Sequence, residues 1–599
     1  MVDIPMTIYY SIEEADNIIR TSKEEFDSIT VGIEKFIDKL VKEIQTFKEK
    51  RRRTCRIAFD GYLGIEWDRV LSKLNEASKD LKIRLRTYNF SECYDLNKLA
   101  SIVEKSLSVD KTFGYVYRGK IVTVLDIKSV KNLRSKLLED SKDADAIICF
   151  GPGSANPILR KDYDIIFYFD ITRETLFNSS EKRPVYYIGD KVAVHQLMRR
   201  FYYIDGPILE NHKKYILKYI NWYIECNSIE NLKLIPKKTY LSILSKVAEQ
   251  PFRIKPLYYP VPWGGNWLKK IKNLPKEMPN SGQGCIVASE NSIRINVNER
   301  ILIEMPFQNL LWAYPEKILG NKVNKKFGGE FPFTYWYDDQ INGGDMAIQV
   351  HADGKYLKEK FNEKIRQDES YYIVYAEEGA KTYLGLRENA DVKEFYEKAL
   401  KAEKEHVPFD HNMYVYSIPT KPGDYFLIPA GTVHASGRNQ VVLEIDGGIS
   451  AYSSGYTFHI YDYLRPDLDG SLRAIHIEHS FNVLKTYRRE KWVLENLKQK
   501  PKLMRKGNGW AEYLIGERKD MYFKTCRLEF EKEIDDDTKR QFHMLTLVEG
   551  EKVLVKAENG REYILHFPDT LTVPASVGRY KIVNLGEGTA KVVKALIRL

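Results

Sequence analysis

Two polar side chains alternate along a short apolar segment, residues 345–356, that reads DMAIQVHADGKY. Gln349 and His351 are two residues apart on an expected strand, so both side chains should point to the same face. An amide oxygen and an imidazole on one face can bind a single metal ion. The alternative for a histidine among apolar residues is a buried, hydrogen-bonded core position. The choice between these interpretations depends on other parts of the chain.

A second histidine follows a strand end at residues 421–439, which read KPGDYFLIPAGTVHASGRN. This segment resembles the second motif of the cupin β barrel, G-x5-P-x-G-x2-H, through Gly423, Pro429, Gly431 and His434. The proline and the second glycine should end a strand and turn the chain so that His434 projects into the barrel mouth. The asparagine that closes the motif falls one residue late, at Asn439, with Arg438 in its place.

Cupin barrels take their other metal ligands from an earlier hairpin, where this chain has suitable residues. Gln349 and His351 lie on that hairpin, and Glu369 begins the next expected strand. With His434 they provide two imidazoles, one carboxylate and one amide oxygen. Such a set suits one zinc ion with an open coordination position, and also Mn, Fe or Co. The six cysteines are scattered without a C-x-x-C pair, which argues against a thiolate zinc site or a disulfide scaffold.

Further motifs extend the resemblance to one enzyme family, the class I mannose-6-phosphate isomerases. They cover about residues 257–475 in the family's order: VPWGGNWL, GGDMAIQVHADGKY, DESYYIVYAEEGAKTYLGL, GDYFLIPAGTVHASG, VVLEID and FHIYDYLRPDLDG. The resemblance implies that Gln349, His351, Glu369 and His434 are the zinc ligands and that Arg465 is the active-site arginine. It also implies a sugar-phosphate substrate, with mannose 6-phosphate converted to fructose 6-phosphate.

The implied reaction accounts for these residue types. Aldose–ketose isomerisation moves a proton between C1 and C2 through an enediol, so negative charge develops on two adjacent oxygens. A Lewis-acid metal and a fixed cation stabilise that charge. Arg465 keeps its proton, so its expected role is oxyanion stabilisation or substrate orientation. Glu444 in VVLEID is the candidate catalytic base, and a structural carboxylate is the equal alternative.

Three features depart from the family pattern. Ala352 replaces the proline that usually follows the histidine of QVH, which should change only the turn. Gln367 replaces a lysine two residues before the ligand glutamate, and this substitution bears on the phosphate preference. Arg366 and Lys381 are the candidate substrate-binding cations in its place, with a surface position as the alternative for each. The third departure is a long N-terminal extension.

That extension contains a predicted parallel α/β domain, residues 54–250. Apolar strand-like runs alternate there with amphipathic helical patterns; the runs are CRIAFDG, IRLRTYNF, VTVLDI, AIICFG, DIIFYFDI and PVYYIGD. The segment RIAFDGYLGIEWDRVL resembles the start of a P-loop kinase domain. Glu66, Trp67 and Asp68 occupy the positions that should hold Gly, Lys and Ser/Thr. Two carboxylates would repel a triphosphate, so we expect a degenerate domain that acts as a scaffold or ligand sensor.

Two other segments of this domain have the pattern of nucleotide-binding elements. Asp170 follows an apolar strand, as in a Walker B segment, although it is equally an ordinary strand end. The segment CFGPGSANP, residues 149–157, is a candidate anion-binding turn, with an ordinary loop as the alternative.

The predicted fold is therefore multidomain, α/β followed by β. It comprises an N-terminal helical segment (1–53), the α/β domain (54–250), a metal-binding cupin barrel (257–475) and a second cupin barrel (476–599). The metal-binding barrel contains a helical insertion, NADVKEFYEKALKAEKEH. In the second barrel Pro574 aligns with Pro429, but Arg579 stands in the place of His434. His543 lies on an early strand without a paired ligand. We expect a metal-free barrel that packs against the first and stiffens it.

Composition limits the class of protein. A chain of 599 residues is too long to fold around a single hydrophobic core, so we expect several domains. No apolar run approaches the roughly 20 residues of a membrane span. The net charge of +10 arises from 93 basic and 83 acidic residues, a mixed surface that does not indicate nucleic-acid binding. The N-terminus does not resemble a signal peptide, so we expect a cytoplasmic location and no membrane partner. The oligomeric state is not predictable from these features.

Two other functional classes stay open. A cupin oxygenase that uses iron is compatible with the ligand types, although Arg465 and the order of the motifs favour the isomerase. A non-catalytic sugar-phosphate-binding or regulatory protein is compatible with the absent lysine and the degenerate P-loop.

Overall fold

The computed structural model describes residues 10–11, 15–80, 82–139, 143–195, 199–288, 290–447, 456–466 and 470–599. The chain forms two compact units, the first from residues 17–246 and 292–313 and the second mainly from residues 247–291 and 314–599. The first unit therefore includes a hairpin that lies inside residues 257–475, the range predicted as the metal-binding barrel. The reason is strand pairing: β12 (Ser292–Val297) and β13 (Ile301–Pro306) form a three-stranded sheet with β2 (Asp16–Ile19).

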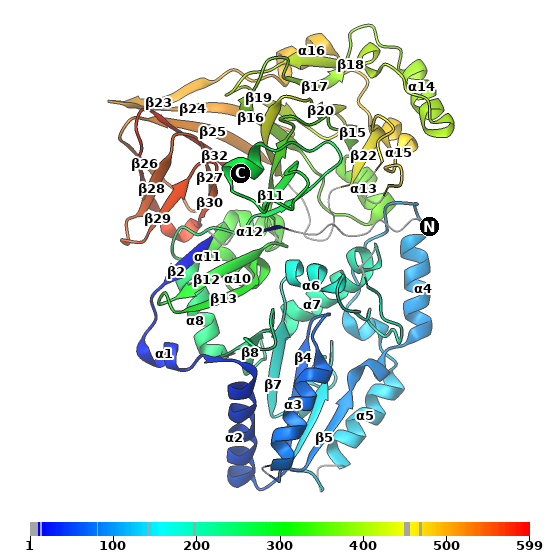
Figure 1. Cartoon of the computed structure of the whole chain (residues 1–599), viewed down its shortest axis with the longest axis vertical. Helices are drawn as coiled ribbons and strands as arrows, with labels where there is room; N and C mark the ends of the chain where they lie inside the picture. Colours follow the sequence, from blue (N-terminus) through cyan, green and yellow to red (C-terminus); the bar gives the residue numbers. More distant parts are fainter. Residues whose placement is uncertain are drawn as a thin grey trace. The chain divides into compact units, whose positions relative to one another are not determined.

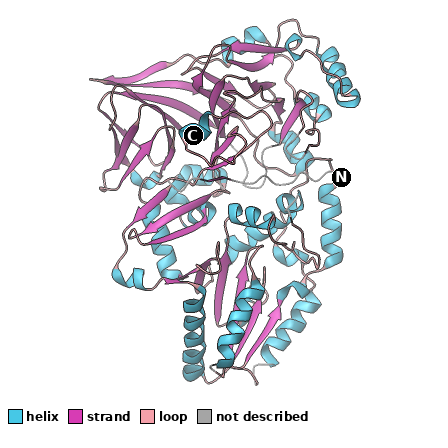
Figure 2. Ribbon diagram, in the orientation of Figure 1, coloured by secondary structure: helices cyan, strands magenta, loops and turns pink. Residues whose placement is uncertain are grey.

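A seven-stranded sheet is the centre of the first unit (Figures 1 and 2). Its central strands are parallel, as predicted, and β9 and β3 are added antiparallel at one edge. All six residues of β7 are buried, which is the pattern of a sheet covered on both faces. In order across the sheet, the strands are β3 (Thr30–Val31), β9 (Lys233–Pro236), β8 (Trp222–Glu225), β7 (Ile165–Asp170), β4 (Cys55–Gly61), β6 (Ala146–Phe150) and β5 (Leu85–Asn89).

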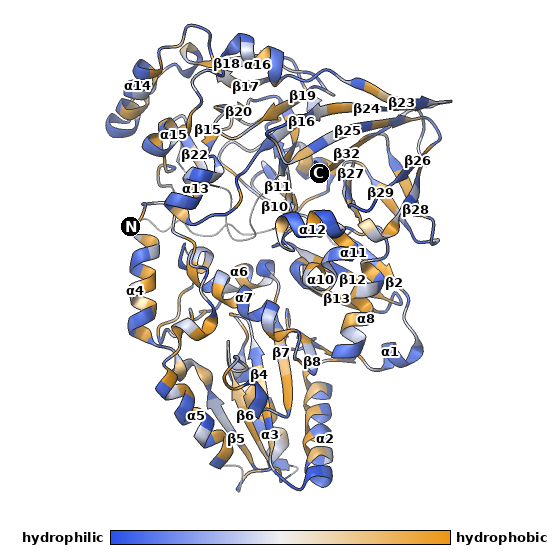
Figure 3. Ribbon diagram, turned by 180° about the vertical axis from the view of Figure 1, so that it is seen from behind, coloured by the Kyte–Doolittle hydropathy of each residue, from blue (hydrophilic) through white to orange (hydrophobic). Residues whose placement is uncertain are grey.

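Amphipathic helices pack on this sheet, and α2 (Ile33–Arg51) shows how. Its buried positions recur with helical spacing and include Phe36, whose ring lies 6.1 Å from that of Phe59 and 6.0 Å from that of Phe167. Figure 3 shows apolar and polar residues alternating along α2 beside the largely apolar β7. The other helices are α1 (Lys23–Asp27), α3 (Trp67–Asp80), α4 (Leu96–Leu107), α5 (Ile127–Glu139), α6 (Arg173–Ser180), α7 (Gly206–Ile216), α8 (Lys237–Val247) and α10 (Phe307–Ala313).

Three local predictions for this region are wrong in part. The run VTVLDI is not a strand: residues 121–124 form a 3₁₀ helix, and Asp126 accepts hydrogen bonds from the amides of Lys128 and Ser129 at the start of α5. The run PVYYIGD makes only an isolated bridge between Val185 and Val194. Residues 1–53 were predicted as helical, yet they include β2 and β3 as well as α1 and α2, while residues 1–9 and 12–14 lie outside the described part.

The candidate anion-binding turn binds a carboxylate of the protein itself. Asp60 is the next-to-last residue of β4 and is fully buried. Its Oδ1 accepts from the amides of Gly61 (2.8 Å) and Gly153 (2.9 Å), and its Oδ2 accepts from the amide of Ala155 (2.8 Å) and lies 2.7 Å from His212 Nε2. The amides of residues 149–157 that could bind phosphate are therefore used to satisfy an internal charge.

The residues at the positions expected to bind a nucleotide make contacts within the protein instead. The ring of Trp67, in the place of the P-loop lysine, lies 5.0 Å from that of Phe169. Asp170 binds Lys213 Nζ at 3.0 Å, with both side chains buried, and its Oδ2 accepts from Tyr223 and Asn309 at 2.9 and 2.7 Å. Carboxyl ends of parallel strands are the usual ligand crevice. At β4 and β7 these ends are filled by paired side chains.

Replacing Asp60 with asparagine should loosen this turn. One amide group cannot accept at both oxygen positions, so at least one buried donor loses its partner, at a cost of about 3 kcal/mol. Hydrogen–deuterium exchange should then show residues 149–157 exchanging on the order of 10²-fold faster. The Asp68→Asn variant, whose side chain is exposed, should leave this exchange unchanged. Equal exchange in both variants would contradict this role of Asp60.

The second unit begins with two facing sheets that form the first barrel. One has the order β1 (Tyr10–Ser11), β10 (Leu257–Tyr259), β11 (Gln283–Val287), β14 (Phe333–Asp339), β21 (Gln440–Gly447), β16 (Glu369–Ala376), β19 (Tyr425–Ile428). The other has the order β18 (Val415–Pro419), β17 (Lys381–Leu386), β20 (His434–Ser436), β15 (Ile348–His351), β22 (Thr457–Tyr461). The predicted helical insertion is confirmed as α14 (Val392–Glu405), which begins at the N-cap Asp391.

Two further sheets form the C-terminal barrel. One has the order β23 (Lys502–Gly507), β24 (Trp510–Glu517), β25 (Phe523–Phe530), β32 (Ala590–Ile597), β27 (His543–Glu549), β30 (Thr570–Val573), and the other β26 (Glu533–Asp537), β31 (Arg579–Asn584), β28 (Lys552–Ala557), β29 (Glu562–His566). Their inner faces share one apolar core that includes Leu528, Leu547, Val555 and Ile582. The helices of this unit are α9 (Trp267–Ile271), α11 (Pro315–Leu319), α12 (Asn321–Phe327), α13 (Gly354–Phe361), α15 (Ile477–Val483) and α16 (Glu490–Asn496).

The two barrels contact each other directly, as predicted. The ring of Phe333 in β14 lies 5.6 Å from that of Phe523 in β25. The hydroxyl of Tyr425 donates to Ser370 within the first barrel and contacts Thr525 of the second, each at 2.7 Å. The first barrel is therefore packed against the C-terminal barrel within the same unit. Among the described residues, no helix is long and apolar enough to cross a membrane.

Candidate metal centre

Strand register brings the expected ligands of one sheet together. Gln349 in β15 pairs with His434 in β20 on one side and with His459 in β22 on the other. Paired residues of neighbouring strands point to the same face, and so does His351, two residues after Gln349. One short row across three strands therefore presents an amide and three imidazoles to the barrel interior.

Glu369 reaches this row from the opposite sheet. Its Oε1 lies 2.5 Å from His351 Nε2, and its Oε2 lies 2.9 Å from His434 Nε2. The amide of Gln349 lies 3.3 Å from the same nitrogen of His434. All four side chains are buried. The structure thus brings together the four residues expected from the sequence, and the candidate ligand atoms of the two histidines and Glu369 lie within 4.8 Å of one another.

The protonation of this cluster suits a cation. His434 Nδ1 lies 2.9 Å from the carbonyl of Thr432, which leaves Nε2 with its lone pair free to bind. His351 Nδ1 has no hydrogen-bond partner among the described residues, and the short contacts of His351 Nε2 and His434 Nε2 with Glu369 bring the candidate ligand atoms together. Burial alone would raise the pKa of Glu369, but His351 and His434 lower it below its usual range. Two imidazole nitrogens and a carboxylate that converge around one point fit a divalent metal ion.

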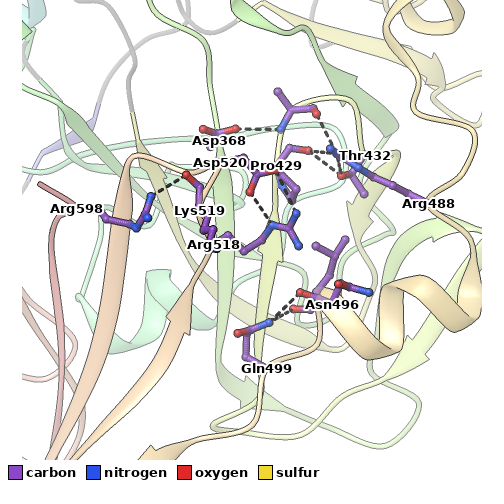
Figure 4. Close-up of polar contacts among 12 residues, drawn as sticks. Asp368, Pro429, Thr432, Arg488, Asn496, Gln499, Arg518, Lys519, Asp520 and Arg598 are labelled. Atoms are coloured by element: carbon purple, nitrogen blue, oxygen red, sulfur yellow. Dashed lines mark hydrogen bonds and ion pairs between the residues drawn. The ribbon is translucent and has the colours of Figure 1, made fainter. Parts of the chain in front are cut away.

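A buried arginine holds the loop that carries His434 (Figure 4). Arg488 Nη1 donates to the carbonyl of Pro429 at 2.7 Å, to that of Ala430 at 2.9 Å and to Thr432 Oγ1 at 2.5 Å. Asp368, next to the candidate ligand Glu369, accepts from the amide of Ala430 at 3.1 Å. The PAGTVH turn is therefore fixed by side chains on two other segments.

Replacing Arg488 with methionine should weaken metal binding without removing a ligand. The carbonyls that it binds would lose their donor, the turn would become mobile, and His434 would be less well oriented. Loss of groups that orient ligands typically costs 10–100-fold in metal affinity, and we expect a loss of about that size in a competition titration with a fluorescent chelator. The exposed Lys491 provides the control, since Lys491→Met should keep the original affinity. Unchanged affinity in a folded Arg488→Met protein would contradict this positioning role.

Glu444 lies in an acidic cluster beside the candidate ligands. It pairs in register with Tyr371 in β16 and with Trp336 in β14, and one of its oxygens lies within 4.8 Å of those of Glu369 and Asp446. Burial and the charges of Asp446, Glu369 and Asp338 raise the pKa of Glu444 well above its usual range. Its Oε2 has no hydrogen-bond partner in the part of the chain that the structure describes. A buried carboxyl with a raised pKa is the type of group that acts as a general acid and base.

Arg465 is held by a carboxylate. Asp462 binds Arg465 and also accepts from Arg473 Nη1 at 2.7 Å. The guanidinium of Arg465 lies 4.8 Å from the ring centre of Tyr463. The final part of the motif FHIYDYLRPDLDG, residues 467–469, lies outside the described residues.

His459 is a site residue that the sequence analysis missed. It faces the same side as Gln349, and its pKa is lowered to about 3 by burial and by the charge of Arg473, with smaller effects of His351 and Arg465. Its imidazole is therefore neutral at pH 7. The alternation in residues 457–461, TFHIY, places His459 on the inward face and was the available signal.

The two candidate substrate-binding cations have internal contacts. Arg366 Nε donates to Asp368 at 3.0 Å, and its guanidinium lies 5.1 Å from the ring centre of Tyr522. Lys381 begins β17, and its Nζ lies 4.8 Å from the ring centre of Tyr383. The amide of Gln367, at the position of the family's lysine, donates to Glu369 Oε1 at 2.5 Å. Gln367 therefore contacts a candidate metal ligand directly.

Comparisons with known proteins divide the chain at about the same place as the fold does. Residues 32–249 match a sequence family described as "Domain of unknown function (DUF8485)". The mannose-6-phosphate isomerase of Streptococcus mutans is 31% identical over 225 residues, 37% of this chain and 64% of that enzyme. This chain therefore spans less than two thirds of that relative. Mannose-6-phosphate isomerase ManA of Bacillus subtilis is 24% identical over 341 residues, 56% of this chain and 97% of the enzyme.

Solved structures of the same description also match. The crystal structure of the mannose 6-phosphate isomerase from Bacillus subtilis aligns with a TM-score of 0.46 and 20% identity, over 58% of this chain and all of that one. A putative mannosephosphate isomerase from Archaeoglobus fulgidus aligns with a TM-score of 0.44 and 19% identity, over 59% of this chain and 98% of that one.

Proposed function

We propose that the protein is a metal-dependent aldose–ketose isomerase that interconverts mannose 6-phosphate and fructose 6-phosphate. The observation that carries this proposal is the convergence of His351, Glu369 and His434, with Gln349 beside them, in a buried site next to a carboxyl of raised pKa. The names of the curated relatives support the choice of reaction and substrate. We assign one zinc ion per chain to these four residues, since they offer only N and O donors.

When bound, the metal supplies Lewis-acid stabilisation of the charge on the enediol oxygens. We assign proton transfer between C1 and C2 to Glu444, through its Oε2 atom, which has no hydrogen-bond partner among the described residues. The guanidinium of Arg465 would stabilise the negative charge that develops on the substrate. Asp462 orients Arg465, and the neutral His459 provides a hydrogen bond to a sugar hydroxyl.

Gln367 and the nearby cations determine how strongly the phosphate group of the substrate would be bound. Its amide is neutral and is directed to Glu369, so it does not replace the lysine of the family pattern. Arg366 and Lys381 stay our candidates for phosphate binding, although each also has a contact within the protein. We expect a weaker preference for the phosphorylated sugar than a lysine at residue 367 would give.

For the first unit we infer a scaffold derived from a P-loop-like fold. The buried Asp60–His212 and Asp170–Lys213 pairs support this inference, because they fill the strand ends where a nucleotide would bind. The ion pair of Glu66 with Arg69, at 3.1 Å, is a further internal use of a former phosphate-loop position.

A direct assay tests the proposed reaction. Purified full-length protein loaded with zinc should convert mannose 6-phosphate to fructose 6-phosphate, and unphosphorylated mannose should be a poorer substrate. Glucose 6-phosphate serves as a control for the configuration at C2. An absence of turnover on every hexose phosphate by the metal-loaded protein would contradict the proposal. Oxygen consumption by the iron-loaded protein would instead support the oxygenase class.

A further inference from the structure

The C-terminal barrel contains a cavity that no part of the proposed reaction uses. Its volume is about 1020 Å³, and its lining comes from both sheets of the barrel. The apolar core occupies the neighbouring positions of the same strands: in β27 Leu545 and Leu547 belong to the core and His543 lines the cavity, and in β32 Val592 belongs to the core and Lys594 lines the cavity. One end of the barrel is therefore packed and the other is open and polar.

The floor of this cavity is a connected network of buried polar groups. Lys594 Nζ lies 2.8 Å from Glu512 Oε1 and 2.5 Å from Asp536 Oδ2. The Tyr580 hydroxyl donates to the same oxygen of Asp536 at 3.1 Å and lies 2.8 Å from His543 Nδ1. Lys594 is 5% exposed and His543 is 3% exposed. Buried charges stabilise a fold less well than apolar side chains of similar volume, so stiffening the first barrel does not explain this network.

The network is held in one protonation state. Burial and the charge of Lys594 lower the pKa of His543 to about 3, so its imidazole is neutral. Because the Tyr580 hydroxyl donates to Asp536, its oxygen accepts from His543 Nδ1–H, and Nε2 keeps its lone pair. The floor thus offers fixed carboxylate, phenol and imidazole groups, which are the hydrogen-bonding partners of sugar hydroxyls.

The rim of the cavity is basic. The lining contains seven lysine and arginine residues against five aspartate and glutamate residues. Arg505 and Lys594 are paired with Glu512 and Asp536, and Lys581 is paired with Glu533. The structure shows no ion pair within its described ranges for the remaining four, Lys524, Lys539, Lys556 and Arg579. Arg579 is also the residue that stands in the aligned position of the metal ligand His434.

We propose that this cavity is a second, non-catalytic binding site for a phosphate monoester of a polyol, with the phosphate at the rim and the hydroxyl groups at the floor. Lysine and arginine bind phosphate oxygens with charge-assisted hydrogen bonds. The carboxylates of Glu512 and Asp536 can accept hydrogen bonds from hydroxyl groups of the ligand, and the Tyr580 oxygen, whose proton goes to Asp536, can accept one as well. The volume is at the upper end of that of small-molecule sites. The site lies in the barrel without the metal ligands, so its occupancy does not depend on isomerase activity.

Isothermal titration calorimetry of chelator-treated full-length protein tests the proposal, with mannose 6-phosphate, inorganic phosphate and mannose as probes. We expect the double variant Lys556→Ser/Arg579→Ser to bind mannose 6-phosphate at least tenfold more weakly than the unaltered chain. The control, Lys502→Ser/Lys532→Ser, removes the same charge from exposed positions outside the cavity and should bind like the unaltered chain. Equal affinity of the two double variants would overturn the proposal.

The probes separate the two halves of the site. Inorganic phosphate and mannose should each bind at least tenfold more weakly than mannose 6-phosphate, and inorganic phosphate binding as tightly would reduce the cavity to an anion site and overturn the proposal. Tyr580→Phe should weaken mannose 6-phosphate severalfold and leave phosphate unchanged, whereas an unchanged affinity for both would overturn the assignment of the floor. Since no turnover is measured, failure of the proposed isomerase reaction would not produce any of these results.

Discussion

Replacing His434 with alanine should abolish stoichiometric metal binding and lower the turnover of mannose 6-phosphate by about 10³-fold. The imidazole supplies one of the nitrogen donors next to Glu369, and its Nε2 is directed to the site by the bond of Nδ1 to Thr432. Lewis-acid stabilisation is worth several kcal/mol, and about 4 kcal/mol corresponds to three orders of magnitude in rate. Metal analysis and a coupled isomerase assay on the same preparation measure both effects.

Two controls distinguish loss of the metal from loss of the fold. The exposed His566 lies in the C-terminal barrel, so His566→Ala should keep metal and activity. His434→Gln retains an oxygen donor at the same position and should recover part of the metal affinity. A folded His434→Ala protein that still holds one metal ion per chain and turns over normally would show that the ligand assignment is incorrect.

Replacing Arg465 with lysine should lower kcat by roughly 10²–10³-fold while the metal content stays the same. The guanidinium is planar and held by Asp462, so a lysine ammonium cannot reproduce its position on the developing charge. Asp462 would keep Arg473 as a partner, which should preserve the local fold. Steady-state kinetics and metal analysis on the same preparation show whether kcat falls while the metal content stays the same.

The matched control for this variant is Arg561→Lys, on the loop before β29 of the C-terminal barrel, which should have ordinary kinetics. Reduced metal content in Arg465→Lys, or unchanged kcat together with unchanged KM, would contradict the assignment of Arg465 to the substrate. A raised KM with unchanged kcat would assign it to substrate binding alone.

The sequence was sufficient to predict those candidate site residues whose side-chain direction follows from local spacing along a strand or turn. Gln349 and His351 alternate on one strand, and the Pro429 and Gly431 positions fix the turn before His434, so each side chain could be placed on an inward face. The acidic neighbours Asp338 and Asp446 could not be inferred. Their proximity to Glu369 depends on the register of β14, β21 and β16, which are far apart in sequence.

The first unit shows the same limit. Parallel strands were predictable from apolar runs, but PVYYIGD has the composition of a strand and pairs only at Val185. For residues 149–157 the sequence left an anion-binding turn and an ordinary loop open, and amides of this segment bind a negative charge of the protein itself. That charge belongs to Asp60, 93 residues from Gly153, and no local pattern identifies such a partner. The hairpin β12–β13 likewise joins the first unit through pairing with a strand near the N-terminus.

The central claim is that one metal ion in the His351–Glu369–His434 site is required for sugar isomerisation. The most direct test is a titration of the chelator-treated protein with zinc while turnover of mannose 6-phosphate is measured. We expect activity to rise in proportion to added metal and to reach its plateau at one equivalent per chain. Full turnover by metal-free protein, or a plateau of activity that bears no relation to the metal bound, would contradict the account.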